Sequence, residues 1–124
     1  MFVFIKPTKD NTQFKSFPIL LSGINLTGVI SLEKGFGFSL QYSLGESYYI
    51  VYSSPHPKKE DAEMALVNCV NLINAIKMAY ERYIHGASVN VQFFELKVNE
   101  EGKPEYVWHK ISEADLTQPI TIEI

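Results

Sequence analysis

The segment from Lys58 to His85 constrains the fold more than any other part of the chain. Its apolar residues recur at three- and four-residue spacing, which is typical of an amphipathic helix. Pro57 comes just before it, acidic residues fill its first turn and Gly86 follows it, an order that favours a helix start and a helix end. At about 1.5 Å per residue, this helix would be roughly 40 Å long. Such a helix is long for a small domain and must dominate its architecture.

The apolar stripe of this helix is wide. Its members are Ala62, Leu66, Cys69, Leu72, Ile73, Ile76, Ala79, Tyr80 and Tyr83, and it is widened by Met64, Val67, Val70 and Met78. A helix that is apolar over most of its circumference predicts packing on a sheet and also on a second surface. A second copy of the chain is a good candidate for that surface. We therefore expect a homodimer, formed through the helix or through a sheet edge.

The residues on either side of the helix alternate as strands do. Candidate strands lie before the helix at 1–6, 26–33, 35–43 and 46–54, and after it at 88–98, 106–111 and 119–124. This order predicts an α+β fold: an antiparallel sheet of about five to seven strands, with the one long helix packed centrally on one face. With 124 residues and 46% hydrophobic content, the chain is expected to form a single domain, residues 1–124.

Two candidate hairpins carry most of the aromatic residues. The first joins the two candidate strands on either side of Gly45, since glycine relieves the backbone of a tight turn. Alternation places on one face of its first strand Phe36, Phe38, Leu40 and Tyr42. The second hairpin follows the helix. Its apolar phase shifts by one residue near Phe93–Phe94, which predicts a bulge there.

Catalytic and metal-binding patterns are missing from the sequence. The three histidines lack the spacing of a metal site. His56 lies in a predicted turn, His85 at a helix end and His109 in a strand. Cys69, the one cysteine, lies in the apolar stripe, where a free cysteine behaves as a small hydrophobic residue. No phosphate-binding loop, nucleophile elbow or zinc-protease motif is present. We therefore expect a protein that is not an enzyme and that holds no metal or cofactor.

Cysteine content and hydropathy indicate a compartment. A single cysteine forms no disulfide within the chain, which is typical of a reducing compartment. No apolar run approaches the roughly 18 residues of a membrane span. The first residues are apolar and have no charged region before them, unlike a signal peptide. We expect a cytoplasmic protein that has no membrane partner.

The stretch Lys34–Phe38, KGFGF, matches in order the start of a known signature. It resembles the signature strand of the RNA-recognition motif, a family that stacks outward aromatic rings of this strand on bases. The resemblance implies that Phe36 and Phe38 are the stacking rings. It is local, because Pro18 interrupts the segment that would supply the helix between the family's first two strands. The additional strand at 46–54 also departs from the family's order.

An antiparallel sheet with exposed rings and lysines can bind single-stranded nucleic acid without that family's topology. Stacking contributes about 1–3 kcal/mol per base, and lysines neutralise phosphates. This hypothesis places the contacts on the first hairpin and near the helix start, at Lys34, Phe36, Phe38, Tyr42, Tyr48, Lys58 and Lys59. Residues 1–59 carry six lysines against three acidic residues, which favours an anion-binding face in this half.

A second hypothesis is a protein-binding module: an inhibitor, immunity or assembly protein that masks the surface of a partner protein. Residues 60–124 carry five basic residues against eleven acidic ones, which favours a basic partner. Tyr106 and Trp108 lie on one face of the same candidate strand, and these residue types are preferred anchors at protein interfaces. The sequence leaves both hypotheses open, with nucleic-acid binding first and protein binding as the alternative.

Overall fold

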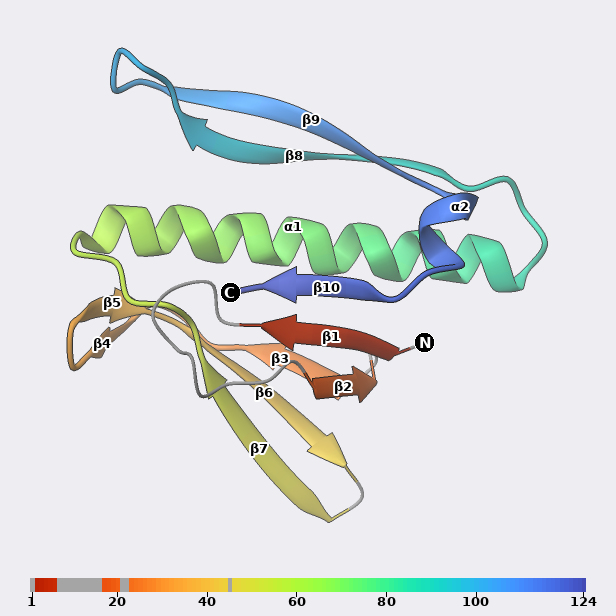
Figure 1. Ribbon diagram of the computed structural model, residues 1–124, viewed down its shortest axis with the longest axis horizontal. Helices are drawn as coiled ribbons and strands as arrows, with labels where there is room; N and C mark the ends of the chain where they lie inside the picture. Colours follow the sequence, from red (N-terminus) through yellow and green to blue (C-terminus); the bar gives the residue numbers. More distant parts are fainter. Residues whose placement is uncertain (1, 7–16, 21–22, 45) are drawn as a thin grey trace. The chain divides into compact units, whose positions relative to one another are not determined.

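The structure, a computed structural model, describes residues 2–6, 17–20, 23–44 and 46–124. Its elements in chain order are β1 (Phe2–Lys6), β2 (Phe17–Leu20), β3 (Ile24–Leu26), β4 (Ile30–Leu32), β5 (Gly35–Gly37), β6 (Ser39–Leu44), β7 (Ser47–Tyr52), α1 (Lys59–Ile84), β8 (Asn90–Val98), β9 (Pro104–Ser112), α2 (Glu113–Leu116) and β10 (Ile120–Glu123) (Figure 1). The predicted α+β class is confirmed, because one long helix packs against mainly antiparallel strands. The strands are divided among several small sheets rather than gathered into one.

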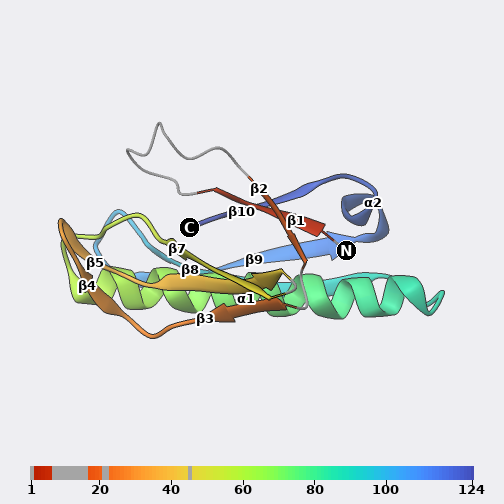
Figure 2. The same ribbon diagram turned by 90° about the horizontal axis from the view of Figure 1, so that it is seen from below.

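The chain divides into two compact units. The first comprises Met1–Val67 with Pro119–Ile124, and the second comprises Asn68–Gln118. The boundary falls within α1, which runs as one unbroken helix (Figure 1 and Figure 2). The expectation that residues 1–124 form one domain stays a prediction.

In the first unit, β1 lies between β10 and β2. It pairs in parallel with β10 and antiparallel with β2, so the first and last strands lie side by side (Figure 1). The centre of this sheet is apolar, since Val3, Ile5 and Ile122 are completely buried. Two further sheets of this unit are antiparallel: β6 pairs with β3 and β7, and β4 pairs with β5.

The first predicted hairpin is present, because β6 and β7 pair along their whole length. The predicted strand 35–43 is, however, two strands, since β5 ends at Gly37 and β6 begins at Ser39. At the break, the Phe38 N–H donates to Ser53 Oγ at 2.9 Å. A Cβ atom at position 37 would lie 2.5 Å from the same Oγ, so any larger residue there would have to displace the Ser53 side chain.

In the second unit, β8 and β9 form the second predicted hairpin. Their register is continuous from Asn90↔Ser112 to Val98↔Pro104, so the bulge predicted near Phe93–Phe94 is wrong. Both phenylalanines are half-buried, and they lie on opposite faces of the hairpin. The apolar phase shifts in the sequence because each face of the hairpin carries apolar side chains, not because the strand is irregular.

Helix α1 begins and ends close to the predicted Lys58 and His85. Its buried residues are Ala62, Cys69, Ile73, Ala75, Ile76 and Ala79. Three of the residues that widen the predicted stripe, Val67, Val70 and Met78, are exposed. The wide stripe is therefore buried on one side of the helix and open on another.

Candidate protein-binding surface

The residues predicted to bind nucleic acid all lie in the first unit and differ in exposure. Phe38 is 1% exposed and Tyr42 is 8% exposed. Because both rings are buried, they offer no face on which a base could stack in this structure. Phe36 is half-buried in β5, where it pairs with Ser31 and bridges to His56. The structure therefore does not assemble these three rings into one exposed surface.

The remaining predicted contacts are lysines and one tyrosine. Lys34, Lys58 and Lys59 are exposed, and the side chain of Tyr48 lies outside the described part of the structure. Tyr52 on β7, another ring of the same hairpin, is 55% exposed. An open pocket of about 490 Å³ is lined by Ser31, Leu32, Glu33, Lys34, Tyr52 and Pro55. The pocket thus joins one ring to one lysine, but its glutamate opposes the binding of a phosphate.

Tyr106 and Trp108, predicted as anchors for a protein partner, are exposed together on β9. Their exposed fractions are 64% and 66%. Both rings contact Phe94 of β8 edge-to-face, with centroid distances of 5.1 Å from Tyr106 and 5.9 Å from Trp108. Alternation places these three rings on one face of the hairpin, together with Leu96 and Val98. These five residues are called the aromatic face below.

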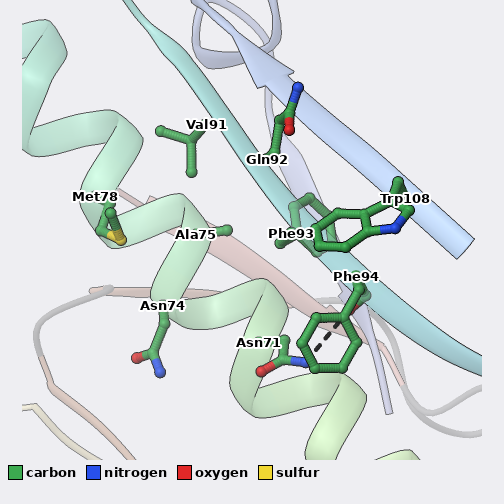
Figure 3. A pocket seen from close by; sticks show the side chains of 9 residues that line it. All are labelled: Asn71, Asn74, Ala75, Met78, Val91, Gln92, Phe93, Phe94 and Trp108. Atoms are coloured by element: carbon green, nitrogen blue, oxygen red, sulfur yellow. Dashed lines mark hydrogen bonds between the residues drawn. The ribbon is translucent and has the colours of Figure 1, made fainter. Parts of the chain in front are cut away.

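Helix α1 fixes β8 through two asparagines. Asn68 Nδ2 donates to the Leu96 carbonyl at 2.9 Å, and the Leu96 N–H donates to Asn68 Oδ1 at 2.8 Å. Asn71 Nδ2 donates to the Phe94 carbonyl at 3.3 Å, the bond dashed in Figure 3. The asparagines thus satisfy backbone groups at the edge of β8 as a neighbouring strand would. The backbone beneath the aromatic face is therefore held in place.

A groove of about 210 Å³ adjoins the aromatic face (Figure 3). It is lined by Asn71, Asn74, Ala75 and Met78 of α1 and by Val91, Gln92, Phe93, Phe94 and Trp108 of the hairpin. Most of these side chains are apolar, and three amides supply hydrogen-bond donors and acceptors. Met78 is 50% exposed, and its flexible thioether suits contact with varied partner surfaces.

The sequence hypothesis named Tyr106 and Trp108 but missed the helix side of this surface. Asn68, Asn71 and Asn74 interrupt the apolar helix at three-residue intervals. A polar residue on an otherwise apolar helix face indicates a nearby hydrogen-bond partner, because an unpaired buried amide is costly. This spacing was the signal from which the contact between helix and hairpin could have been found.

The opposite face of the hairpin carries charged and titratable groups. Glu95 Oε1 lies 3.1 Å from Lys97 Nζ and 3.9 Å from His109 Nε2. The His109 ring stacks on Phe93 with centroids 5.3 Å apart. Within the described ranges, no three histidine, cysteine, aspartate or glutamate side chains gather to hold a metal ion. Burial raises the pKa of Cys69 to about 12, so this thiol is not poised to act as a nucleophile.

Hydropathy and comparison with known proteins add two findings. Among the helices that the structure describes, none combines the length and the apolar character that crossing a membrane requires. Comparison of the chain with protein-family models, with curated proteins and with solved structures finds no match.

Proposed function

We propose that this chain is a non-enzymatic protein-binding module, of the inhibitor, immunity or assembly kind, that masks the surface of a partner protein. The observation that carries the proposal is the exposure of Tyr106 and Trp108, 64% and 66%, side by side on Phe94. Burying such rings at an interface removes apolar surface from water, which is favourable. Tyrosine and tryptophan are also among the residue types that contribute most to binding energy at interfaces.

The support beneath the rings favours tight binding. Asn68 and Asn71 hold the backbone of Leu96 and Phe94, so the strand under the rings is already ordered. An ordered surface loses less conformational freedom when a partner docks than a flexible loop does. The groove beside Met78 gives a partner side chain an apolar place to enter.

The charge of the chain indicates what the partner surface is like. Residues 60–124, which include the aromatic face, carry eleven acidic side chains against five basic ones. A partner with lysine and arginine around an apolar centre would be attracted to this half and would associate faster at low ionic strength. We therefore propose a protein partner with a basic rim and an apolar centre.

Capture of partners with three baits tests the proposal. The baits are the wild-type chain, the double variant Tyr106→Ala with Trp108→Ala, and Tyr52→Ala. Tyr52 is the matched control, because it is 55% exposed but lies in the other unit. Proteins held by the wild type and by Tyr52→Ala should be lost from the double variant. An identical set of proteins on all three baits would contradict the proposal.

Trp108 also reports on the site directly, because it is the only tryptophan in the sequence. Since the ring is 66% exposed, acrylamide should quench its fluorescence readily in the free chain. A captured partner should shift the emission to shorter wavelength and protect the ring from acrylamide. Binding that leaves the quenching unchanged would place the interface elsewhere on the molecule.

Single-stranded nucleic-acid binding is a second proposal, favoured by the open pocket that brings Lys34 and Tyr52 together. One exposed ring that stacks on one base contributes about 1–3 kcal/mol. Binding of a fluorescent oligo-dT strand should be weakened by Tyr52→Ala, by Lys34→Ala and by added salt. An anisotropy that does not change at low ionic strength would reject this function.

We also propose that the chain forms a homodimer in the cytoplasm, as its apolar helix and single cysteine indicate. Two exposed surfaces suit self-association: the side of α1 that carries Val67, Val70 and Met78, and the outer edge of β9. Sedimentation at micromolar concentrations tests the dimer. A species of twice the 14.1 kDa chain mass supports it, and a monomer throughout refutes it.

A further inference from the structure

The two edges of the β8–β9 hairpin differ in how their backbone groups are satisfied. The N–H and C=O groups of Leu96 point away from β9, because both bond to Asn68. In an antiparallel pair, the residue directly opposite such a position also points its backbone N–H and C=O groups away from the pair. The same orientation is repeated at every second residue along both strands. Tyr106, Trp108 and Lys110 are at the matching register positions and point their backbone groups outward from β9. Among the described residues, no hydrogen bond reaches these outward groups.

β9 is an edge strand with no bulge and no internal proline to prevent pairing. Its nine residues keep a continuous register with β8. Natural edge strands are commonly short, bulged or interrupted by proline. Here the one proline, Pro104, is the first residue of the strand, so the remainder can pair along its length. A long, regular and open edge is a template for a further strand.

We infer that β9 pairs antiparallel with β9 of a second copy of this chain, with Val107 on the two-fold axis. In this register the outward backbone groups of Tyr106 meet those of Trp108 of the second copy. Glu105 then lies opposite His109 of the second copy, and symmetry makes this contact twice. Lys97, which opposes Glu105 within the hairpin, extends the same row. Carboxylate, imidazole and ammonium groups thus form one complementary row across the interface.

Other antiparallel registers lose this complementarity. A shift of two residues sets Glu105 opposite Ile111 of the second copy in one direction and opposite Val107 in the other. In both cases the carboxylate faces an apolar side chain. A shift of four residues toward the β8–β9 turn sets Glu105 opposite itself, and like charges opposed across strands are destabilising. The strand is therefore self-complementary in the register centred on Val107.

The same register would widen the aromatic face. Within one copy, Phe94 opposes Trp108 and Leu96 opposes Tyr106. Pairing Tyr106 with Trp108 of the second copy joins these rows across four strands. The role of such a dimer rests on the proposed function, because the second copy would double the surface that a partner protein meets.

Cysteine substitution tests the register. In the proposed register, Val107 and its copy face each other as a pair that exchanges no main-chain hydrogen bonds. The Cα atoms of such a pair are about 4.5 Å apart, which is within the range that a disulfide can bridge. Val107→Cys should therefore give a linked dimer on mild oxidation. His109→Cys should not, because its two copies would be offset by about 13 Å along the strands. The wild-type chain is the background control, since Cys69 is buried. Linkage at 109 without linkage at 107 would overturn the inference.

Proline substitution tests the edge. Lys110→Pro removes an outward N–H but leaves the bonds to β8, so the hairpin should fold, as circular dichroism can verify. The dimer should dissociate about tenfold or more readily, because each copy loses one donor at the interface. Lys110→Ala, the matched control, should dimerise like the wild type in sedimentation. Equal dimerisation of the two variants would place the contact elsewhere, such as on α1, and would overturn the inference.

Different results would refute the proposed dimer and the proposed binding function. A monomeric wild-type chain that still captures proteins through Tyr106 and Trp108 would overturn the dimer and leave the proposed function standing. A wild-type dimer that captures the same proteins after both rings are removed would reject the aromatic face as the binding site. In that case the register test with Val107→Cys still decides how the two copies meet.

Discussion

Two aromatic hairpins of this chain have similar sequence patterns but differ in which rings they bury. The hairpin of β6 and β7 follows Phe38, which is 1% exposed, and contains Tyr42, which is buried. The hairpin of β8 and β9 exposes Tyr106 and Trp108. Both hairpins place aromatic residues at alternating positions, so the strand pattern does not decide which rings are covered. The covering elements decide it.

The contact made by α1 explains part of this difference. In the second unit, Asn68 and Asn71 bond to backbone groups at the edge of β8 rather than packing over the aromatic face. A helix held at a strand edge leaves that face open to solvent. An amphipathic helix that precedes a hairpin therefore does not by itself imply that the aromatic side of the hairpin is covered.

The largest expected effect compares one ring from each region. Phe38→Ala should lower the free energy of unfolding by about 3–5 kcal/mol, because the ring is buried and its loss leaves a cavity. Trp108→Ala should lower it by about 1 kcal/mol or less, since the exposed ring loses mainly its contact with Phe94. Urea unfolding measures both. Equal losses of unfolding free energy would contradict the difference in burial between Phe38 and Trp108.

A second comparison uses one glycine from each region. Gly35 has φ of +143°, and a Cβ atom there would collide with the His56 carbonyl oxygen. Gly102 in the β8–β9 turn has φ of +77° with open space around it. Gly35→Ala should cost about 2–3 kcal/mol and Gly102→Ala about 1–2 kcal/mol. Thermal unfolding ranks the two, and a greater loss from Gly102→Ala would contradict the close backbone packing at Gly35.

The contact between helix and hairpin provides a third test. Asn68→Ala leaves the N–H and C=O groups of Leu96 without their partners and should cost about 1–3 kcal/mol. The Leu96 amide should also exchange its hydrogen faster than in the wild type. Asn74→Ala is the matched control, because Asn74 is an exposed asparagine on the same helix. Unchanged exchange at Leu96 would argue that the edge is held by something else.

The smallest effect at neutral pH concerns Cys69. Burial raises the pKa of its thiol from 9.0 to about 12, so the unfolded chain releases this proton first as the pH rises. The resulting contribution to stability is complete below about pH 9 and is lost as the pH rises toward 12. A thiol reagent at pH 8 should label the folded chain slowly and the urea-unfolded chain rapidly. Rapid labelling of the folded chain would contradict the burial.

Periodicity predicted those parts of the fold that depend on local pattern. The helix was placed to within a residue or so of Lys59 and Ile84, since its caps and its stripe act over short distances. Both hairpins were placed for the same reason. The division of the strands into small sheets was not predicted, because strand pairing such as that of β1 with β10 joins residues far apart in sequence.

The sequence predicted only part of the candidate site. Tyr106 and Trp108 were named from residue type and shared face, and both are exposed. Phe38 and Tyr42 were named by the same reasoning and are buried. Alternation separates the two faces of a strand but does not identify the one that meets solvent. Asn71 lines the groove because α1 contacts the hairpin in the folded chain. The alternation of residues along the strands does not predict that contact.

Occupation of the β8 edge by α1 has a consequence for how large an assembly can grow. A two-stranded ribbon with both edges open could add strands on either side without end, as fibrils do. In this hairpin, Asn68 and Asn71 occupy backbone groups on one side, which leaves β9 as the side available for growth. If β9 meets β9 of a second copy as proposed, each outer edge of the ribbon is a β8 strand that α1 already contacts at Leu96 and Phe94. Association through β9 should therefore stop at two chains rather than continue into a fibre.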